Sequence, residues 1–431
     1  MRASWRLLAS NRDLKALLAA GLVSGIGDWI LIAGLLYHVY AMTRSTVASA
    51  LTIFSAFAPQ VLLGPVGGAF ADKWDRKLTM IVTDVLLAIG LLPLLAVRSG
   101  AQVWIVFAVL VWEGAVEQFF TPAQQAMVPR VVPNDQLVVA NGFNGQVSAI
   151  SRLAGSGLGG LIAAVSGIVG ISLADAVSFV VSAAVLTLVR TSGAVERGAA
   201  HGRRLVALAQ DLRTGLQLSA KHRVLRKLMV FAMITSIGEG IVGTLFAPFF
   251  RHVLHGSSQS FGLFLAAQAI GSIVGGAVVT SFGPRVPAWR LVSYGAIGFG
   301  ALDLAIFLYP VGYVAVWPAT VWIVLVGLPG ALCTAGLLTL FQRNTEDSHR
   351  GRVYGAFVAV NGTAVLMGSL AAGYLSQPLA IIPVIALQGA GYLIAGLLMT
   401  VWLRDSEHVP AHPAPTASAS ERASLIGADG L

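Results

Sequence analysis

The sequence predicts an all-α membrane protein with twelve transmembrane helices, arranged as two pseudo-symmetric six-helix bundles. Apolar runs close to or longer than 20 residues recur along the chain, and each can cross a hydrocarbon core of ~30 Å. Only 11% of the 431 residues are charged, against about a quarter in soluble proteins. In addition, short motifs of the first half recur at matching places in the second half.

The apolar runs place the spans, and the bases between them predict the orientation. The predicted spans are 15–40, 47–70, 78–97, 101–120, 138–165, 168–189, 227–250, 261–282, 290–309, 313–340, 354–375 and 379–403. If the N-terminus is cytoplasmic, nearly all of the 28 Lys and Arg residues fall on that side, and only Arg44, Arg98 and Arg251 fall opposite. By the positive-inside rule, both termini are expected in the cytoplasm. These bases explain the formal charge of +9 without a nucleic-acid partner.

The chain is expected to have four parts. They are an N-terminal six-helix bundle (1–190), a cytoplasmic amphipathic linker (191–226), a C-terminal six-helix bundle (227–403) and a disordered cytoplasmic tail (404–431). Leucines recur at near-helical spacing from Leu205 to Leu216, which predicts a linker helix on the membrane surface. The tail is rich in Pro, Ala and Ser, a composition typical of disorder.

Two pairs of motifs indicate that the halves arose by duplication. The stretch Ile26–Ile30 (IGDWI) recurs as Ile237–Ile241 (IGEGI), and Gly67–Ala69 recurs as Gly275–Ala277 at the end of the second span of each half. Transporters built from internal repeats bind their substrates near the bilayer midplane, between the repeats. The sequence therefore favours a transporter.

The charged loop after the second span, GGAFADKWDRK (67–77), resembles the loop motif of the major facilitator superfamily. The matching residues are Gly68, Asp72, Arg76 and Lys77. Three further stretches, 122–142, 152–160 and 342–355, resemble the branch that contains macrolide-efflux and siderophore (enterobactin-type) exporters. The resemblance spans about residues 12–403, and it implies the major facilitator fold and export of a drug, macrolide, siderophore or secondary metabolite.

The chain departs from the pattern of this family at two places. Ser156 stands where antiporters usually carry a proline in the fifth helix, and Trp112-Glu113 stands where many drug antiporters carry an arginine in the fourth. Only the first half retains an acid in the loop, because Thr280 stands opposite Asp72. We therefore interpret the loop as a gate, in which Asp72 and Arg76 latch onto residues 350–354 and hold the outward-facing state.

Two acids lie at equivalent depths of the first and seventh spans. Asp28 is about halfway through the first span, and Glu239 occupies the matching place in the seventh. Ionisable groups inside a membrane are costly and need a partner or a function. We expect both to face a central cavity, as a proton site or as counter-charges for a cationic substrate. The alternative is a capping or inter-helix hydrogen bond.

Further ionisable groups lie within the fourth, fifth, sixth and ninth spans. Glu113 and Glu117 are four residues apart and share a helix face. Two such carboxylates in a low dielectric do not both ionise cheaply, so one is expected to carry a proton near neutral pH. Arg152 is the expected partner of Glu113, either as a pair that breaks and re-forms or as a static salt bridge. Asp303 is a lone acid with the same candidate roles, and Asp175 is assigned a structural role.

These observations predict a proton-coupled antiporter of the bacterial inner membrane that exports amphiphilic or cationic organic compounds by alternating access. The alternatives are uptake of a small metabolite, a lipid flippase and a membrane scaffold. No phosphate-binding GxxxxGK[ST] motif is present, so the proton gradient is the expected driving force and no cofactor is expected. A metal site is not expected, and an enzyme is disfavoured because nucleophile clusters are lacking. The expected partners are the small-molecule substrate and lipids, and a monomer is expected.

Overall fold

A computed structural model describes residues 11–71, 74–133, 136–193, 204–282, 285–345 and 349–404, and these residues form helices joined by short turns. The long helices are α2 (Arg12–Thr43), α3 (Thr46–Ala71), α4 (Arg76–Gly90), α5 (Val103–Val131), α6 (Leu137–Thr187), α7 (Arg204–Lys221), α8 (Arg223–Pro248), α9 (Ser258–Phe282), α10 (Ala288–Leu308), α11 (Val316–Arg343), α12 (Arg350–Leu379) and α13 (Ile381–Arg404). All but α7 belong to a stretch long and apolar enough to cross a membrane, and for α4 this stretch continues through the short 3-10 turn that follows it, to Ala96. The predicted all-α class is therefore confirmed.

Helix α6 accounts for two of the twelve predicted spans, because it is a helical hairpin. Gly167 interrupts its 51 residues with φ 58° and ψ −150°, a conformation that residues with a side chain rarely adopt. Before this residue, Gly155 packs against Trp29 of α2; after it, Ile171 packs against Gly34 and Asp175 against Gly27. The two arms therefore run along α2 in opposite directions. The predicted break at 166–167 is the point at which the chain turns.

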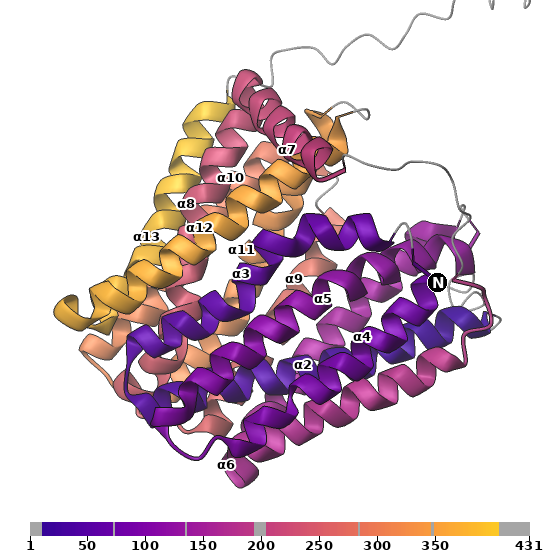
Figure 1. Ribbon diagram of the computed structural model, residues 1–431. Helices are drawn as coiled ribbons and strands as arrows, with labels where there is room; N and C mark the ends of the chain where they lie inside the picture. The colour runs from indigo at the N-terminus through magenta and orange to yellow at the C-terminus, as the bar shows by residue number, and fades with distance from the viewer. Residues whose placement is uncertain are drawn as a thin grey trace, which may run out of the picture.

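Helices α2–α6 lie together, and helices α8–α13 lie together beside them, with α7 across one end of the second group (Figure 1). Apolar side chains fill the interior of each group. Leu31, Leu91 and Val106 belong to the core of the first group, and Phe250 and Phe307 belong to the core of the second.

Close contacts between the groups lie in the middle of the helices and at the end remote from α7. At the remote end, the Tyr37 hydroxyl donates to the Gly256 carbonyl oxygen at 2.8 Å, and Thr46 Oγ1 donates to the Gly373 carbonyl oxygen at 2.9 Å. Close to this end, α6 and α9 cross where Gly160 faces Gly262, and nearer the middle Gly157 faces Ala266.

At the other end, which we call the α7 end, the helices of the two groups approach less closely. A Cβ added at Gly142 on α6, Gly276 on α9 or Gly355 on α12 would meet no atom within 4 Å among the described residues. The described part of the chain is therefore closed at the remote end and more open at the α7 end.

The linker and gate fall partly outside the described residues. Helix α7 forms as predicted and packs on α12, where Gly215 lies against the Arg352 carbonyl. The tail beyond Arg404 and the gate residue Asp72 lie outside the described residues. The lipid-surface position of α7 and the four-part division remain predictions.

Candidate functional site

A cavity of about 680 Å³ lies within the first helical group. It runs from the middle of α2, at Asp28 and Trp29, to the end of α5 at Pro129 and the start of α6 at Leu137. It therefore reaches toward the α7 end, where the two groups are less closely packed. Its volume lies within the roughly 300–1,000 Å³ that is usual for small-molecule sites.

The lining of the cavity is polar and acidic. Four carboxylates contribute to it, from Asp28 on α2, Asp84 on α4, and Glu113 and Glu117 on α5. Amide side chains of Gln124, Gln125 and Asn144 line the part nearer the α7 end, and Trp29 and Phe120 add aromatic surface. The described lining residues include no Lys, Arg or His. Because a buried charge in an apolar interior is costly, this lining favours protons or a cationic occupant.

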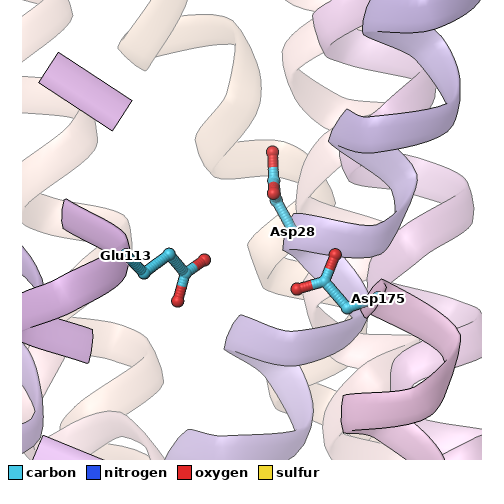
Figure 2. A group of neighbouring side chains, drawn as sticks. All are labelled: Asp28, Glu113 and Asp175. Atoms are coloured by element: carbon cyan, nitrogen blue, oxygen red, sulfur yellow. The ribbon is translucent and has the colours of Figure 1, made fainter. Parts of the chain in front are cut away.

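Three carboxylates meet at the deep end of the cavity, near the middle of α2: Asp28 and Glu113 line the cavity, and the fully buried Asp175 lies beside them. One oxygen from each of Asp28, Glu113 and Asp175 lies within 4.8 Å of the other two. Figure 2 shows Glu113 reaching from one side toward Asp28 and Asp175, which come from neighbouring helices on the other side. We call these three residues the carboxylate trio.

The trio depends on small residues and on one hydrogen bond. Gly27, next to Asp28, lets Asp175 and Ser178 of α6 approach the backbone of α2. Ser178 Oγ donates to Asp175 Oδ1 at 3.1 Å and so holds this buried carboxylate in place. Asp175 Oδ2 and Glu113 Oε2 accept no hydrogen bond from any described residue. Each of these two carboxylates thus keeps one oxygen available.

Arg152 is not paired with Glu113 in this conformation, although the sequence suggested that pair and both residues are described. Its Nη2 donates to Ser272 Oγ of α9 at 2.6 Å, and its guanidinium lies over the Trp29 ring at 5.8 Å. Arg152 therefore joins the two helical groups, while Glu113 faces two other acids. The predicted static salt bridge is absent here for that reason.

In the second helical group, the equivalent acid, Glu239, has hydrogen-bond donors beside it. Glu239 Oε1 accepts from the Tyr392 hydroxyl at 2.6 Å and from Gln388 Nε2 at 3.2 Å. Gly238 packs against Gln388 just as Gly27 packs against Asp175, so the two halves place equivalent side chains together. The cavity described above is lined by Asp28 but not by Glu239. This cavity therefore does not bring the two acids together, and the expectation that both face a central cavity stays a prediction.

The remaining predicted residues lie away from the trio. Asp303 on α10 is 3% exposed, in the second group. Arg76 Nη1 donates to the Ala126 carbonyl at 3.0 Å, and Lys77 Nζ donates to the carbonyls of Thr187 and Val189, all in the first group. Gly68 lies in α3. The structure does not test the gating latch.

The prediction from sequence did not include two acids of the site. Asp84 was not considered, although an acid in a predicted span is itself a signal of function. Asp175 was assigned a structural role, and nothing in its local sequence indicates that it meets Asp28 and Glu113. The hairpin at Gly167 brings it there.

Comparison with known proteins identifies relatives along nearly the whole chain. A family model described as "Transmembrane secretion effector" matches residues 6–422. The chain is 22% identical to the uncharacterised MFS-type transporter YfiS of Bacillus subtilis, over 93% of this chain and 95% of that protein. It is 21% identical to macrolide efflux protein A of Streptococcus pyogenes (80% and 85%) and 23% identical to the staphyloferrin A transporter of Staphylococcus aureus (84% and 89%).

Solved structures of transporters share the fold. A bacterial homologue of the iron transporter ferroportin, in an inward-facing state, superimposes with a TM-score of 0.73 at 17% identity, over 91% of this chain and 98% of that one. A point mutant of the nucleoside transporter NupG gives a TM-score of 0.73 at 12% identity, over 90% and 99%. At these identities the likeness concerns the fold alone.

Proposed function

The chain belongs to the family of transmembrane secretion effectors, within the major facilitator superfamily of transporters, and on this basis we propose that it exports cationic, amphiphilic organic compounds in exchange for protons. The observation that carries the proposal is the acidic cavity, in which four carboxylates and several amides line about 680 Å³ without a described base. An organic cation gains counter-charges there, and its apolar part gains contact with Trp29 and Phe120.

The position of the cavity supports export. With the cytoplasmic N-terminus that the bases predict, the α7 end faces the cytoplasm, and the cavity is loaded from inside the cell. The relative named for macrolide efflux agrees with a secretory role. The acidic lining favours cationic members among drugs, macrolides, siderophores and secondary metabolites. We place the protein in the bacterial inner membrane, among lipids, as a monomer.

Protons are the proposed coupling ion because the trio gathers carboxylates that do not all ionise cheaply together. A pH difference of one unit supplies ~1.4 kcal/mol per proton. A membrane potential of ~100 mV adds about 2.3 kcal/mol per charge. In this scheme, protons entering from the outer side neutralise Asp28 and Glu113 and release the organic cation, and loss of the protons inside restores the site. No cofactor takes part in this scheme.

The alternatives fit the cavity less well. A lipid flippase needs basic side chains for phosphate headgroups, and the described lining holds none. Uptake of a small metabolite would use the same fold in the opposite direction. The direction of dye movement in the experiment below separates uptake from export.

The test is transport into inverted membrane vesicles with an imposed pH gradient, acid inside, using a fluorescent organic cation. We expect gradient-dependent accumulation by the wild type, its loss in Asp28→Asn, and partial retention in Asp28→Glu, which keeps a carboxyl group. Accumulation by Asp28→Asn at the wild-type rate would remove Asp28 from the mechanism. Absence of accumulation for every cation and macrolide tried would refute proton-driven export.

A further inference from the structure

The deep end of the cavity has the composition of an inorganic cation site. All three members of the carboxylate trio offer oxygen, and no described His, Cys or Met side chain belongs to the trio or to the cavity lining. Oxygen-only donor sets suit hard cations such as Mg²⁺, Mn²⁺ and Ca²⁺, whereas soft or borderline metals are usually held by sulfur or imidazole. The donor chemistry therefore selects one class of ion.

The spacing of the trio fits a single ion. Oxygens bound to Ca²⁺ lie about 2.3–2.6 Å from it, so two oxygens on opposite sides of one ion are up to about 5 Å apart. The three carboxylate oxygens here lie within 4.8 Å of one another. An ion placed between these oxygens lies within reach of all three carboxylates, and Figure 2 shows Glu113 directed toward Asp28 and Asp175.

The carboxylates of this region lack the partners that would otherwise account for them. Asp175 is fully buried, and its Oδ2 accepts no hydrogen bond from the described residues. Outside the trio, Asp84 is 1% exposed and lines the same cavity; Ser182 lies beside it, but neither of the Asp84 carboxylate oxygens accepts a hydrogen bond of good geometry from the described residues. Buried polar groups are satisfied in nearly all proteins, so unsatisfied ones that gather in a cavity point to a missing ligand.

In the second helical group, the equivalent acid receives its hydrogen bonds from protein side chains. Glu239 occupies the place equivalent to Asp28, and the side chains facing it are Gln388 and Tyr392, which both donate to it. In the first group, the facing side chain is another carboxylate, Asp175. Where the second group has Gln388, which donates a hydrogen bond to Glu239, the first group has Asp175, whose carboxylate can only accept hydrogen bonds or bind a cation when ionised.

We propose that Asp28, Glu113 and Asp175 bind one hard divalent cation of the Mg²⁺, Mn²⁺ and Ca²⁺ class at the deep end of the cavity. The ion offsets two of the three negative charges that the trio carries when ionised. Binding of the ion stands on the geometry of the trio. Its consequence, that the ion and the organic cation exclude one another, rests on the proposed function.

The test measures Mn²⁺ binding to the purified full-length protein at pH 7.5, through loss of the electron paramagnetic resonance signal of free Mn²⁺. We expect one saturable site per chain and at least a tenfold loss of affinity in Asp175→Asn and in Glu113→Gln, because each removes one of three charged ligands. Asp303→Asn is the matched control, since it neutralises a buried acid of the other helical group and leaves the trio intact. Elution as a single species in size-exclusion chromatography verifies that each variant is folded.

Excess Ca²⁺ or Mg²⁺ is expected to return the free Mn²⁺ signal, and equal Na⁺ is not. The site is refuted if the wild type binds no Mn²⁺ stoichiometrically, if Glu113→Gln binds as the wild type does, or if Na⁺ displaces the ion equally well. The dye transport described above separates the two proposals. Transport without Mn²⁺ binding refutes this site alone, and Mn²⁺ binding without proton-driven transport refutes the proposed function alone.

Discussion

The crossing of α6 and α9 at Gly160 can be perturbed by a single methyl group. A Cβ at this position would lie 2.7 Å from Gly262 Cα and 2.8 Å from the Ser258 carbonyl oxygen. Both neighbours are backbone atoms of the other helical group, so neither can turn aside as a side chain does. Gly160→Ala therefore forces the two groups apart where they touch.

The size of the effect follows from the cost of overpacking. Extra methyl groups in a well-packed interior cost about 1–3 kcal/mol. If that cost falls only on the state in which the helices touch, the ratio between this state and others changes roughly 5- to 150-fold. A change of this size turns a conformer that is rare in the wild type into one that is readily measured.

The assay is a distance measurement between spin labels on the two helical groups. Arg98 and Val311 are exposed, lie on opposite groups and belong to the end remote from α7. The native Cys333 is buried and is replaced by alanine before labels are introduced. We expect a second distance population in Gly160→Ala, together with slower dye transport.

Gly142→Ala is the matched control, because it makes the same change in the same helix where a Cβ meets nothing within 4 Å among the described residues. Both variants raise helix propensity by about the same amount, up to ~1 kcal/mol. The distance distribution of Gly142→Ala should equal that of the wild type. If Gly160→Ala also gives the wild-type distribution, the crossing does not set the conformation and the reasoning fails.

Three further substitutions test separate contacts. Tyr37→Phe removes the hydroxyl that accepts from Arg251 Nη1 at 3.0 Å, and we expect the remote end to open, seen as a longer distance between labels across it; an unchanged distance would contradict this. Tyr392→Phe takes a donor from Glu239 and should destabilise the protein by about 1–3 kcal/mol in thermal melting, whereas an unchanged melting temperature would show that this bond is not needed. Asp72→Asn should slow transport while substrate affinity stays near the wild-type value, and a large loss of affinity would refute the gating latch.

The sequence was sufficient for the fold because lipid imposes simple rules on a chain. Each span must be long, apolar and helical, since the hydrocarbon offers no partner for backbone polar groups. Even the turn at Gly167 was predictable, because only Ser166 and Gly167 separate two apolar runs there. By contrast, the composition of each span says little about which helix it faces. The contact of Asp175 with Asp28 therefore could not be predicted.

The partner of Arg152 also could not be predicted from the sequence. Within the first half, Glu113 was the natural partner for its charge, and the pairing argument was sound for a closed bundle of six helices. The actual partner, Ser272, belongs to the second half, at a crossing that depends on how the two halves meet. A transporter changes the contact between its two halves during its cycle, so the sequence does not specify a single partner for Arg152.

The two halves differ in the side chains that face their equivalent acids, and this difference favours the first half as the place where protons or cations bind. A carboxylate that receives two hydrogen bonds, as Glu239 does, is held without a ligand. Asp28 faces Asp175 and Glu113 instead, so the first half remains unsatisfied until a proton or a cation enters. Both halves carry an acid at equivalent places, and in the proposed scheme the half whose carboxylates keep oxygens without a described donor is the one that binds protons or cations. We therefore expect the loss of Asp28 to abolish coupling and the loss of Glu239 to act chiefly through stability.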